Sequence, residues 1–256
     1  MTDIPERSLG FHKEQHWLAA NFLENYLELK ERSGLRILEI GSAEGGVLNY
    51  LASKGHCCFG IEHSWSRYEM ACKINQSVRI HFIHGDITEP KTYATQLNDL
   101  MDIIISCDVI EHIPADKKEA ALLNMKNLLA INGLLFISFP PKYSPFAGHQ
   151  QVVPSWAGRI PYLFLLPDGL YAAYLKRLKT SVQTVADLIA TKHDRLSINQ
   201  FEKLAQNLGL KILKKDFYLI RPAYEYRFGI RRLRHNCTNF ILKEILTLGA
   251  VYLLHQ

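Results

Sequence analysis

The sequence predicts an α/β fold, a seven-stranded and mostly parallel sheet with helices on both faces and an inserted segment after the fifth strand. Three observations predict it. Short apolar runs alternate with helical segments between residues 35 and 141. A glycine-rich turn, residues 41–46, directly follows the first apolar run, and about 55 residues, 142–196, separate the fifth strand from the next helix.

Each element follows from the residue pattern. Apolar residues three or four apart predict an amphipathic helix within 11–33, ahead of the first strand. Because helical crossovers join the first five strands, their carboxyl ends lie on one edge, where ligands bind. We expect strands at 35–40, 57–62, 78–86, 101–108, 133–141, 211–220 and 249–256, and helices at 45–55, 65–76, 90–100, 115–131 and 197–210.

Composition narrows the function classes. The chain is 48% apolar and 21% charged, which is typical of a globular protein, and its net charge of +5 permits an acidic ligand or an anionic membrane. Nucleic acid is disfavoured as a partner, because the dense basic run 227–234 lacks interleaved aromatic residues. Three features favour a cytoplasmic protein. The five cysteines form no C-x-x-C pair, the N-terminus does not resemble a secretory leader, and no run approaches about 20 apolar residues.

The glycine-rich turn indicates a nucleotide site. Its sequence, Gly41-Ser42-Ala43-Glu44-Gly45-Gly46, does not fit the G-x-G-x-x-G pattern of dinucleotide sites, which weighs against a nicotinamide-dependent oxidoreductase. Glu62 lies 21 residues after Gly41, at the end of the second apolar run. A carboxylate there accepts hydrogen bonds from two ribose hydroxyls, because it is an acceptor only.

The order E-x-G-x-x-x-G over residues 39–45 resembles motif I of class I S-adenosylmethionine-dependent methyltransferases, whose usual form is E/D-x-G-x-G-x-G. Ala43 departs from that form, although a small residue still lets the turn approach the ligand closely. HGD at 84–86 matches the family's adenine-contacting aspartate, and SCDVIEHI at 106–113 matches the segment after its fourth strand. The resemblance implies a Rossmann-like sheet with the strand order 3-2-1-4-5-7-6 and a lid inserted after the fifth strand.

The resemblance also implies S-adenosylmethionine as cofactor. Glu39 would hold its amino group through water, Glu62 its ribose, and Asp86 its adenine, with Ile87 beside the ring. The complete expected set is Glu39, Gly41, Ser42, Ala43, Gly45, Glu62, His63, Asp86, Ile87 and Asp108. The corresponding division of the chain is an N-terminal helical cap at 1–33, a cofactor-binding core at 34–141, an acceptor-side lid at 142–196 and the rest of the core sheet at 197–256.

Two histidines are candidate general bases. His112 follows Glu111 after the fourth strand, and a similar E-H pair lies in this segment of the quinone-biosynthesis O-methyltransferase type. The alternative is that the pair caps the following helix. His149 lies in the segment 139–151, which leaves the fifth strand through a rigid FPP sequence. Its alternative role is a hydrogen bond to the backbone of a turn-rich loop. We expect Tyr143, Gln150 and Trp156 to bind the acceptor, and no metal, because no convincing carboxylate cluster is present.

The segment 152–179 is rich in aromatic and aliphatic residues and ends in Lys176, Arg177 and Lys179. It fits a hydrophobic lid, an interfacial element at the inner face of a membrane, or a subdomain or dimer contact. With the loop before it, this segment is similar to methyltransferases that accompany bacterial surface-polysaccharide synthesis. The leading function is O-methylation of a small-molecule, glycan or lipid-linked hydroxyl. A non-catalytic methyltransferase-like module and an oxidoreductase are the alternatives, and the oligomeric state stays open.

Overall fold

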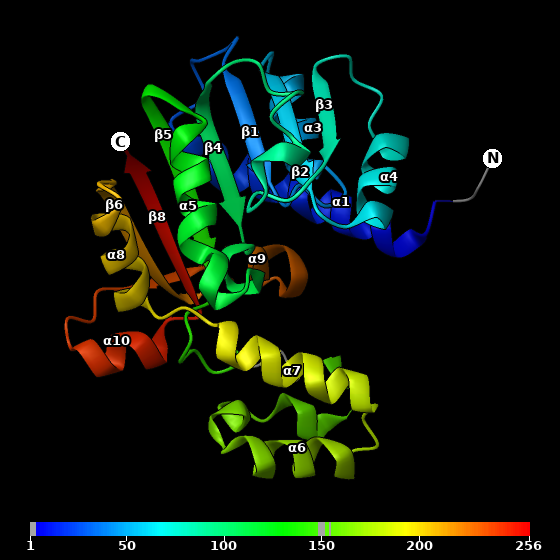
Figure 1. The fold of residues 1–256 in the computed structure, drawn as a ribbon, viewed down its shortest axis with the longest axis vertical. Helices are drawn as coiled ribbons and strands as arrows, with labels where there is room; N and C mark the ends of the chain where they lie inside the picture. Colours follow the sequence, from blue (N-terminus) through cyan, green and yellow to red (C-terminus); the bar gives the residue numbers. More distant parts are fainter. Residues whose placement is uncertain (1–3, 148–151, 154) are drawn as a thin grey trace.

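A computed structural model of the chain describes residues 4–147, 152–153 and 155–256, and a single eight-stranded sheet forms its centre (Figure 1). The strands are β1 (Arg36–Ile40), β2 (Cys57–Glu62), β3 (Ile80–His84), β4 (Met101–Cys107), β5 (Leu129–Phe139), β6 (Lys211–Ile220), β7 (Leu233–His235) and β8 (Gly249–His255). Their spatial order is β3-β2-β1-β4-β5-β8-β6-β7.

The predicted fold class is confirmed, with one difference in strand count. Strands β1 to β5 pair in parallel, and β8 inserts antiparallel between β5 and β6. With β8 as the seventh predicted strand, the order is the expected 3-2-1-4-5-7-6. The eighth strand is β7, three residues that pair antiparallel with β6 at the sheet edge. It lies in the basic run, where no apolar alternation indicates a strand.

Helices cover both faces of the sheet. On one face, α1, the following π-helix η1 and α3 enclose a core that includes Phe22, Leu48 and Phe136; on the other, α5 and α8 enclose one that includes Leu122 and Phe201. The helices are α1 (Glu6–Leu18), η1 (Ala19–Leu23), α2 (Glu24–Tyr26), α3 (Gly46–Ser53), α4 (Trp65–Ile74), α5 (Lys118–Asn127), α6 (Asp168–Arg177), α7 (Val182–Asp194), α8 (Ile198–Asn207), α9 (Ala223–Phe228) and α10 (Phe240–Leu246).

Two predicted helices are wrong in extent. The helix expected at 90–100 is only the 3₁₀ turn η2 (Pro90–Thr92), because the following residues form turns that bury Tyr93 and Leu97. The helix expected at 115–131 begins as the 3₁₀ turn η4 (Ala115–Lys117) and ends with α5 at Asn127, because β5 begins at Leu129, which pairs with Met101 of β4. Gly133 therefore lies inside the strand rather than after a helix.

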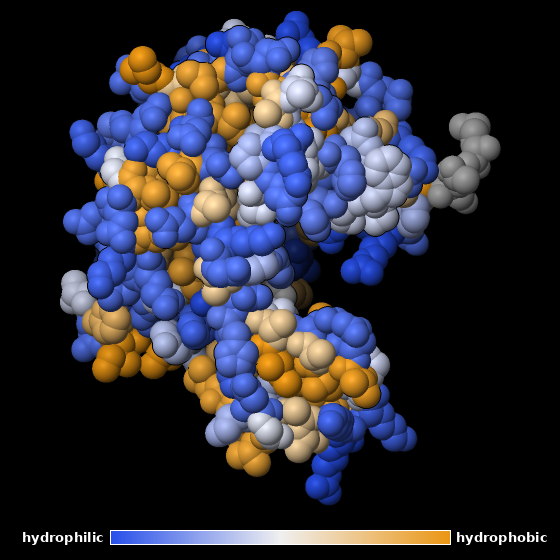
Figure 2. Space-filling model, viewed as in Figure 1, coloured by the Kyte–Doolittle hydropathy of each residue, from blue (hydrophilic) through white to orange (hydrophobic). Residues whose placement is uncertain are grey.

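The segment between β5 and α8 forms a helical unit at the carboxyl edge of the sheet (Figure 1). It contains the 3₁₀ turns η6 (Trp156–Arg159) and η7 (Leu163–Leu165), followed by α6 and α7. Seven buried apolar residues form its own core: Ala147, Val153, Phe164, Tyr171, Leu175, Val185 and Leu188. The molecule is hollowed between this unit and the sheet (Figure 2).

Candidate functional site

A cavity of about 870 Å³ opens at the carboxyl edge of the parallel strands. Its walls come from the segments that follow β1, β2, β3 and β4, together with residues of α1 and α9. This is the edge at which open α/β sheets bind their ligands, and the volume lies within the usual range for ligand sites. The cavity is therefore the candidate active site.

The glycine-rich turn forms the part of the cavity next to β1. Gly41 has a φ of +69°, and a Cβ on it would lie 2.5 Å from Cγ2 of Val109, so only glycine fits there. Ala43 also adopts a left-handed conformation, with φ at +47°, at the position where the resembled motif usually has glycine. Gly41 and Ala43 line the cavity, whereas Ser42 is fully buried behind it and Gly45 precedes α3 as its N-cap.

Gln15 of α1 holds this turn in place. Its buried amide nitrogen donates to the Ser42 carbonyl at 3.2 Å, and its amide oxygen accepts from the Gly46 N–H at 3.1 Å. A Cβ on Gly46 would lie 2.1 Å from the His12 carbonyl oxygen, so this glycine permits the close packing of α1 against α3. Sequence reasoning missed Gln15. The apolar periodicity predicts an N-terminal helix that covers the core, but it does not indicate which polar side chain of that helix faces the glycine-rich turn.

Glu62 links the turn to the end of β2. One carboxylate oxygen accepts from the Ala43 N–H at 2.8 Å, and the other accepts from the Ser64 N–H at 2.8 Å. The side chain is buried and lines the cavity. Each oxygen retains acceptor capacity, so the carboxylate fits two ligand hydroxyls while the backbone fixes its orientation.

Glu39 is a deeply buried carboxyl group in the cavity wall. It is 1% exposed, and its Oε2 has no hydrogen-bond partner among the residues that the structure describes. Burial, and then the nearby charge of Glu62, raise the pKa of Glu39 well above its usual range. A cationic group next to Glu39 would relieve this cost, so its position fits the amino group of the expected cofactor.

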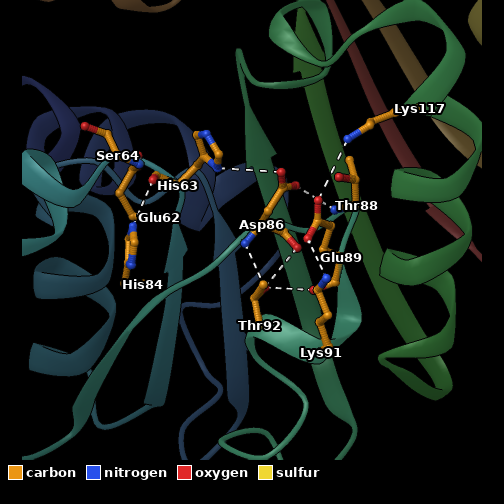
Figure 3. Close-up of polar contacts among 10 residues, drawn as sticks. All are labelled: Glu62, His63, Ser64, His84, Asp86, Thr88, Glu89, Lys91, Thr92 and Lys117. Carbon is orange, nitrogen blue, oxygen red and sulfur yellow. Dashed lines mark hydrogen bonds and ion pairs between the residues drawn. The ribbon is translucent and has the colours of Figure 1, made fainter.

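The segment after β3 supplies the next wall, drawn in Figure 3. One oxygen of Asp86 accepts from the Thr88 N–H at 2.8 Å, and the other lies 3.6 Å from Nδ1 of His63, the residue after β2. Ile87 is buried beside them, and its carbonyl accepts from Asn124 of α5. His63, Asp86 and Ile87 all line the cavity, so neighbouring strand ends bring them together as the sequence pattern predicts.

Asp108, directly after β4, is held in place by a residue that follows a strand not adjacent to β4. Its Oδ2 forms an ion pair with Arg221, which follows β6, and both residues line the cavity. The backbone at Asp108 has a φ of +56°, so the chain turns sharply here. Sequence reasoning missed Arg221, because its partner lies 113 positions away and no motif connects the two residues.

The 3₁₀ turn η3 (Ile110–His112) carries Glu111 and His112 into the cavity wall. Lys118 of α5 fixes the turn by donating to the carbonyl oxygens of Ile110 and Ile113. Burial, followed by the charge of Asp108, raises the pKa of Glu111 to about 8. Packing around the imidazole, followed by the positive charge of Arg195, lowers the pKa of His112, so its ring is neutral near pH 7.

Two of the predicted acceptor-side residues lie away from this cavity. Tyr143 is half-exposed and Trp156 is 81% exposed, and neither lines the cavity. His149 and Gln150 lie outside the described residues. The structure therefore brings the candidate cofactor residues and His112 together, and it places the two described residues of the insertion elsewhere.

The described part of the chain holds no group of three or more His, Cys, Asp or Glu side chains arranged to bind a metal ion. Within the same residues, no helix combines the length and apolar character needed to cross a membrane.

Comparisons with known proteins agree with this geometry. A family model described as a methyltransferase domain matches residues 11–215. The fold is similar to a TehB-like SAM-dependent methyltransferase from Corynebacterium glutamicum, with a TM-score of 0.55, 16% identity and coverage of 98% of this chain and 99% of that one.

Two further solved structures share the fold. Magnesium protoporphyrin IX methyltransferase from Synechocystis, with bound SAM, has a TM-score of 0.51, 14% identity and coverage of 96% of this chain and 79% of that one. The plantazolicin methyltransferase BamL, in complex with a triazolic desmethylPZN analog and SAH, has a TM-score of 0.55, 14% identity and coverage of 97% of this chain and 85% of that one. No curated protein matches the chain.

Proposed function

The chain belongs to the methyltransferase domain family and is an S-adenosylmethionine-dependent methyltransferase, and from this premise we propose that it methylates a hydroxyl oxygen. When bound, the cofactor supplies an activated methyl group, so the protein has to align the acceptor and take up its proton. The proposed acceptor is a small-molecule, glycan or lipid-linked hydroxyl.

One observation carries the cofactor assignment. Glu62 and Asp86 follow adjacent strands (Figure 3) and line a single cavity, in which Glu62 is fixed by two backbone N–H groups and Glu39 is buried in the wall. Glu62 has acceptor capacity for two ribose hydroxyls, Asp86 for the adenine amino group, and Glu39 for a cation. These three carboxylates match the donors and the charge that S-adenosylmethionine presents.

The proposal that oxygen is the methylated atom rests on His112. A hydroxyl needs a proton acceptor as its oxygen attacks, and a neutral imidazole in the cavity wall fits that role. His149, which lies outside the described residues, stays a second candidate for the same role.

Transfer of labelled methyl from S-adenosylmethionine to hydroxyl, amine and thiol probes tests this proposal. We expect label in hydroxyl probes, and His112→Ala to lower turnover at least about tenfold with cofactor affinity unchanged. His81→Ala, at an exposed position on β3, is the matched control. Labelling of amine or thiol probes alone contradicts O-methylation, and full activity of His112→Ala shifts the base role to another residue.

We also propose that the insertion contacts an anionic membrane surface, which suits a lipid-linked acceptor. Trp156, Leu165 and Leu170 are exposed on it, and Phe240, Ile241 and Leu242 are exposed on the neighbouring α10. The hydroxyl of Tyr162 donates to the Ile245 carbonyl at 3.2 Å, which links the insertion to α10. Lys176, Arg177 and Lys179 supply positive charge nearby in the sequence.

Flotation with lipid vesicles tests this contact. We expect the protein to float with anionic vesicles at low salt, and the double variant Trp156→Ser, Ile241→Ser to lose most of that binding. Neutral phosphatidylcholine vesicles serve as the control. If the protein stays unbound on anionic vesicles at low salt, the membrane proposal is wrong.

A further inference from the structure

A cluster of buried charges lies where the insertion returns to the sheet. Glu111 is 1% exposed and lines the cavity, and its Oε2 has no partner among the described residues. Arg195, directly after α7, is 3% exposed, and none of its guanidinium nitrogens is hydrogen-bonded to the described part of the chain. The mechanism proposed above uses neither side chain.

The packing of α7 brings these groups together. The Ala115 N–H donates to Asp194 at 3.1 Å, and the Lys142 N–H donates to the Leu196 carbonyl at 2.9 Å, so both ends of the insertion meet beside η3. The negative charges of Glu111 and Asp108 act on the buried guanidinium of Arg195, and its positive charge acts on Glu111 in turn. Arg195 does not line the cavity, so its charge acts on Glu111 from outside the cavity.

The charges of this cluster balance when Glu111 is ionised. Asp108 and Glu111 supply two carboxyl groups, and Arg221 and Arg195 supply two guanidinium groups. An anionic ligand group would meet two carboxyl groups in the cavity wall, and a cationic one would meet Arg221. A neutral donor, such as a hydroxyl, fits the unpartnered oxygen of Glu111 without disturbing this balance.

The distance between the side chains of Glu111 and His112 indicates how many ligand hydroxyls they can bind together. Oε1 of Glu111, on the same carboxyl carbon as the unpartnered Oε2, lies 3.9 Å from Nε2 of His112, the proposed proton acceptor. Hydroxyl hydrogen bonds span roughly 2.5–3.0 Å. Two neighbouring hydroxyls of one molecule can therefore address the two side chains together, one hydroxyl on each.

We propose that the acceptor is a neutral molecule with two adjacent hydroxyl groups, one methylated beside His112 and the other bound by Glu111, with Arg195 as a positioning residue for Glu111. The proposal rests on the proposed O-methylation. It adds the substrate class, a neutral diol such as a sugar or cyclic polyol. It also gives the insertion a role, because its return segment supplies the charge that supports the diol-binding carboxylate.

The test measures probe binding to the protein saturated with S-adenosylhomocysteine, by saturation-transfer NMR at pH 9, where Glu111 is mostly ionised. The probes are cis-cyclohexane-1,2-diol, cyclohexanol and 3,4-dihydroxycyclohexanecarboxylate. We expect the diol to bind more tightly than either of the others. Glu111→Gln should weaken the diol about tenfold, the loss typical of a charge-assisted hydrogen bond, and change cyclohexanol less than about twofold.

Variants of Arg195 separate positioning from folding. Arg195→Met should weaken the diol as Glu111→Gln does, although Arg195 does not line the cavity, and Arg195→Lys should restore most of the binding. Glu119→Gln and Arg32→Met, at exposed positions, are the matched controls. S-adenosylhomocysteine affinity, measured for every variant, verifies that the site is folded.

Three results overturn the inference: no diol binding to the loaded protein, unchanged diol binding in Glu111→Gln, or tighter binding of the carboxylate probe than of the diol. If the wild-type protein fails to bind S-adenosylhomocysteine at all, the proposed function fails first and the inference falls with it. If labelled methyl enters amines alone while the diol binds as expected, O-methylation and methyl transfer to the diol are both wrong, and only the diol-binding role of Glu111 stands.

Discussion

At the scale of single residues, Glu39 couples the candidate cofactor site to pH. Its carboxyl group is enclosed in the cavity wall, and burial with the nearby Glu62 raises its pKa well above the usual range. The raised pKa therefore favours the protonated form of Glu39 in the free protein. A cation bound beside Glu39 favours the ionised form, because opposite charges attract strongly where water is excluded.

We expect S-adenosylmethionine binding to release a proton from Glu39 and to tighten as pH rises toward the raised pKa of the free protein. The measurement is calorimetric titration in two buffers of different ionisation enthalpy. Glu39→Gln should abolish the proton release, and Glu119→Gln, at an exposed position on α5, should leave it unchanged. Equal binding enthalpies in both buffers contradict this role for Glu39.

The residues of the site fall into two groups, those that the sequence pattern predicts and those that only the structure reveals. Glu39, Gly41, Glu62 and Asp86 were predictable, because each lies at the end of its own strand or in the glycine-rich turn, and one sheet edge gathers them. Gln15, Arg195 and Arg221 were not, because each approaches from a distant element and its partner depends on tertiary packing. His149 and Gln150 stay predictions, since they lie outside the described residues.

At the scale of elements, α1 is part of the candidate site rather than a cover over it. Gln15 bridges both ends of the glycine-rich turn, and Phe11, Glu14 and Leu18 of the same helix line the cavity. Arg227 of α9 forms an ion pair with Glu14 across the cavity wall. The sequence pattern predicted a helix here, but neither the five-residue π-helix η1 that follows α1 nor the contact of α1 with the turn, which accompanies its packing against α3.

Removing the Gln15 side chain should loosen the turn. Gln15→Ala deletes two hydrogen bonds, each worth about 0.5–1.5 kcal/mol, and leaves the Gly46 N–H buried without its acceptor. We expect S-adenosylhomocysteine affinity to fall about three- to tenfold, because the turn is no longer preorganised. Calorimetry measures this, with Gln96→Ala, an exposed glutamine, as control. Unchanged affinity means that the turn keeps its shape without α1.

At the scale of the whole molecule, one sheet edge gathers the candidate donor site, the candidate base and the carboxylate that we propose binds the diol. The sheet order was predictable, because short crossovers restrict the topology, and β7 escaped prediction because it pairs over only three residues. The internal packing of the insertion was not predictable, since its apolar residues fit a lid, a membrane contact or a subdomain equally well. The structure shows that they include a core of their own.

The most direct test of the central claim is a calorimetric titration of the wild-type protein and Glu62→Gln with S-adenosylhomocysteine. We expect one site per chain in the wild type. The affinity should fall at least about tenfold in Glu62→Gln, because the amide loses a charged acceptor and points its NH₂ group at a backbone N–H. Absence of wild-type binding, or equal affinity in the two proteins, contradicts the assignment of this sheet edge as the methyl-donor site.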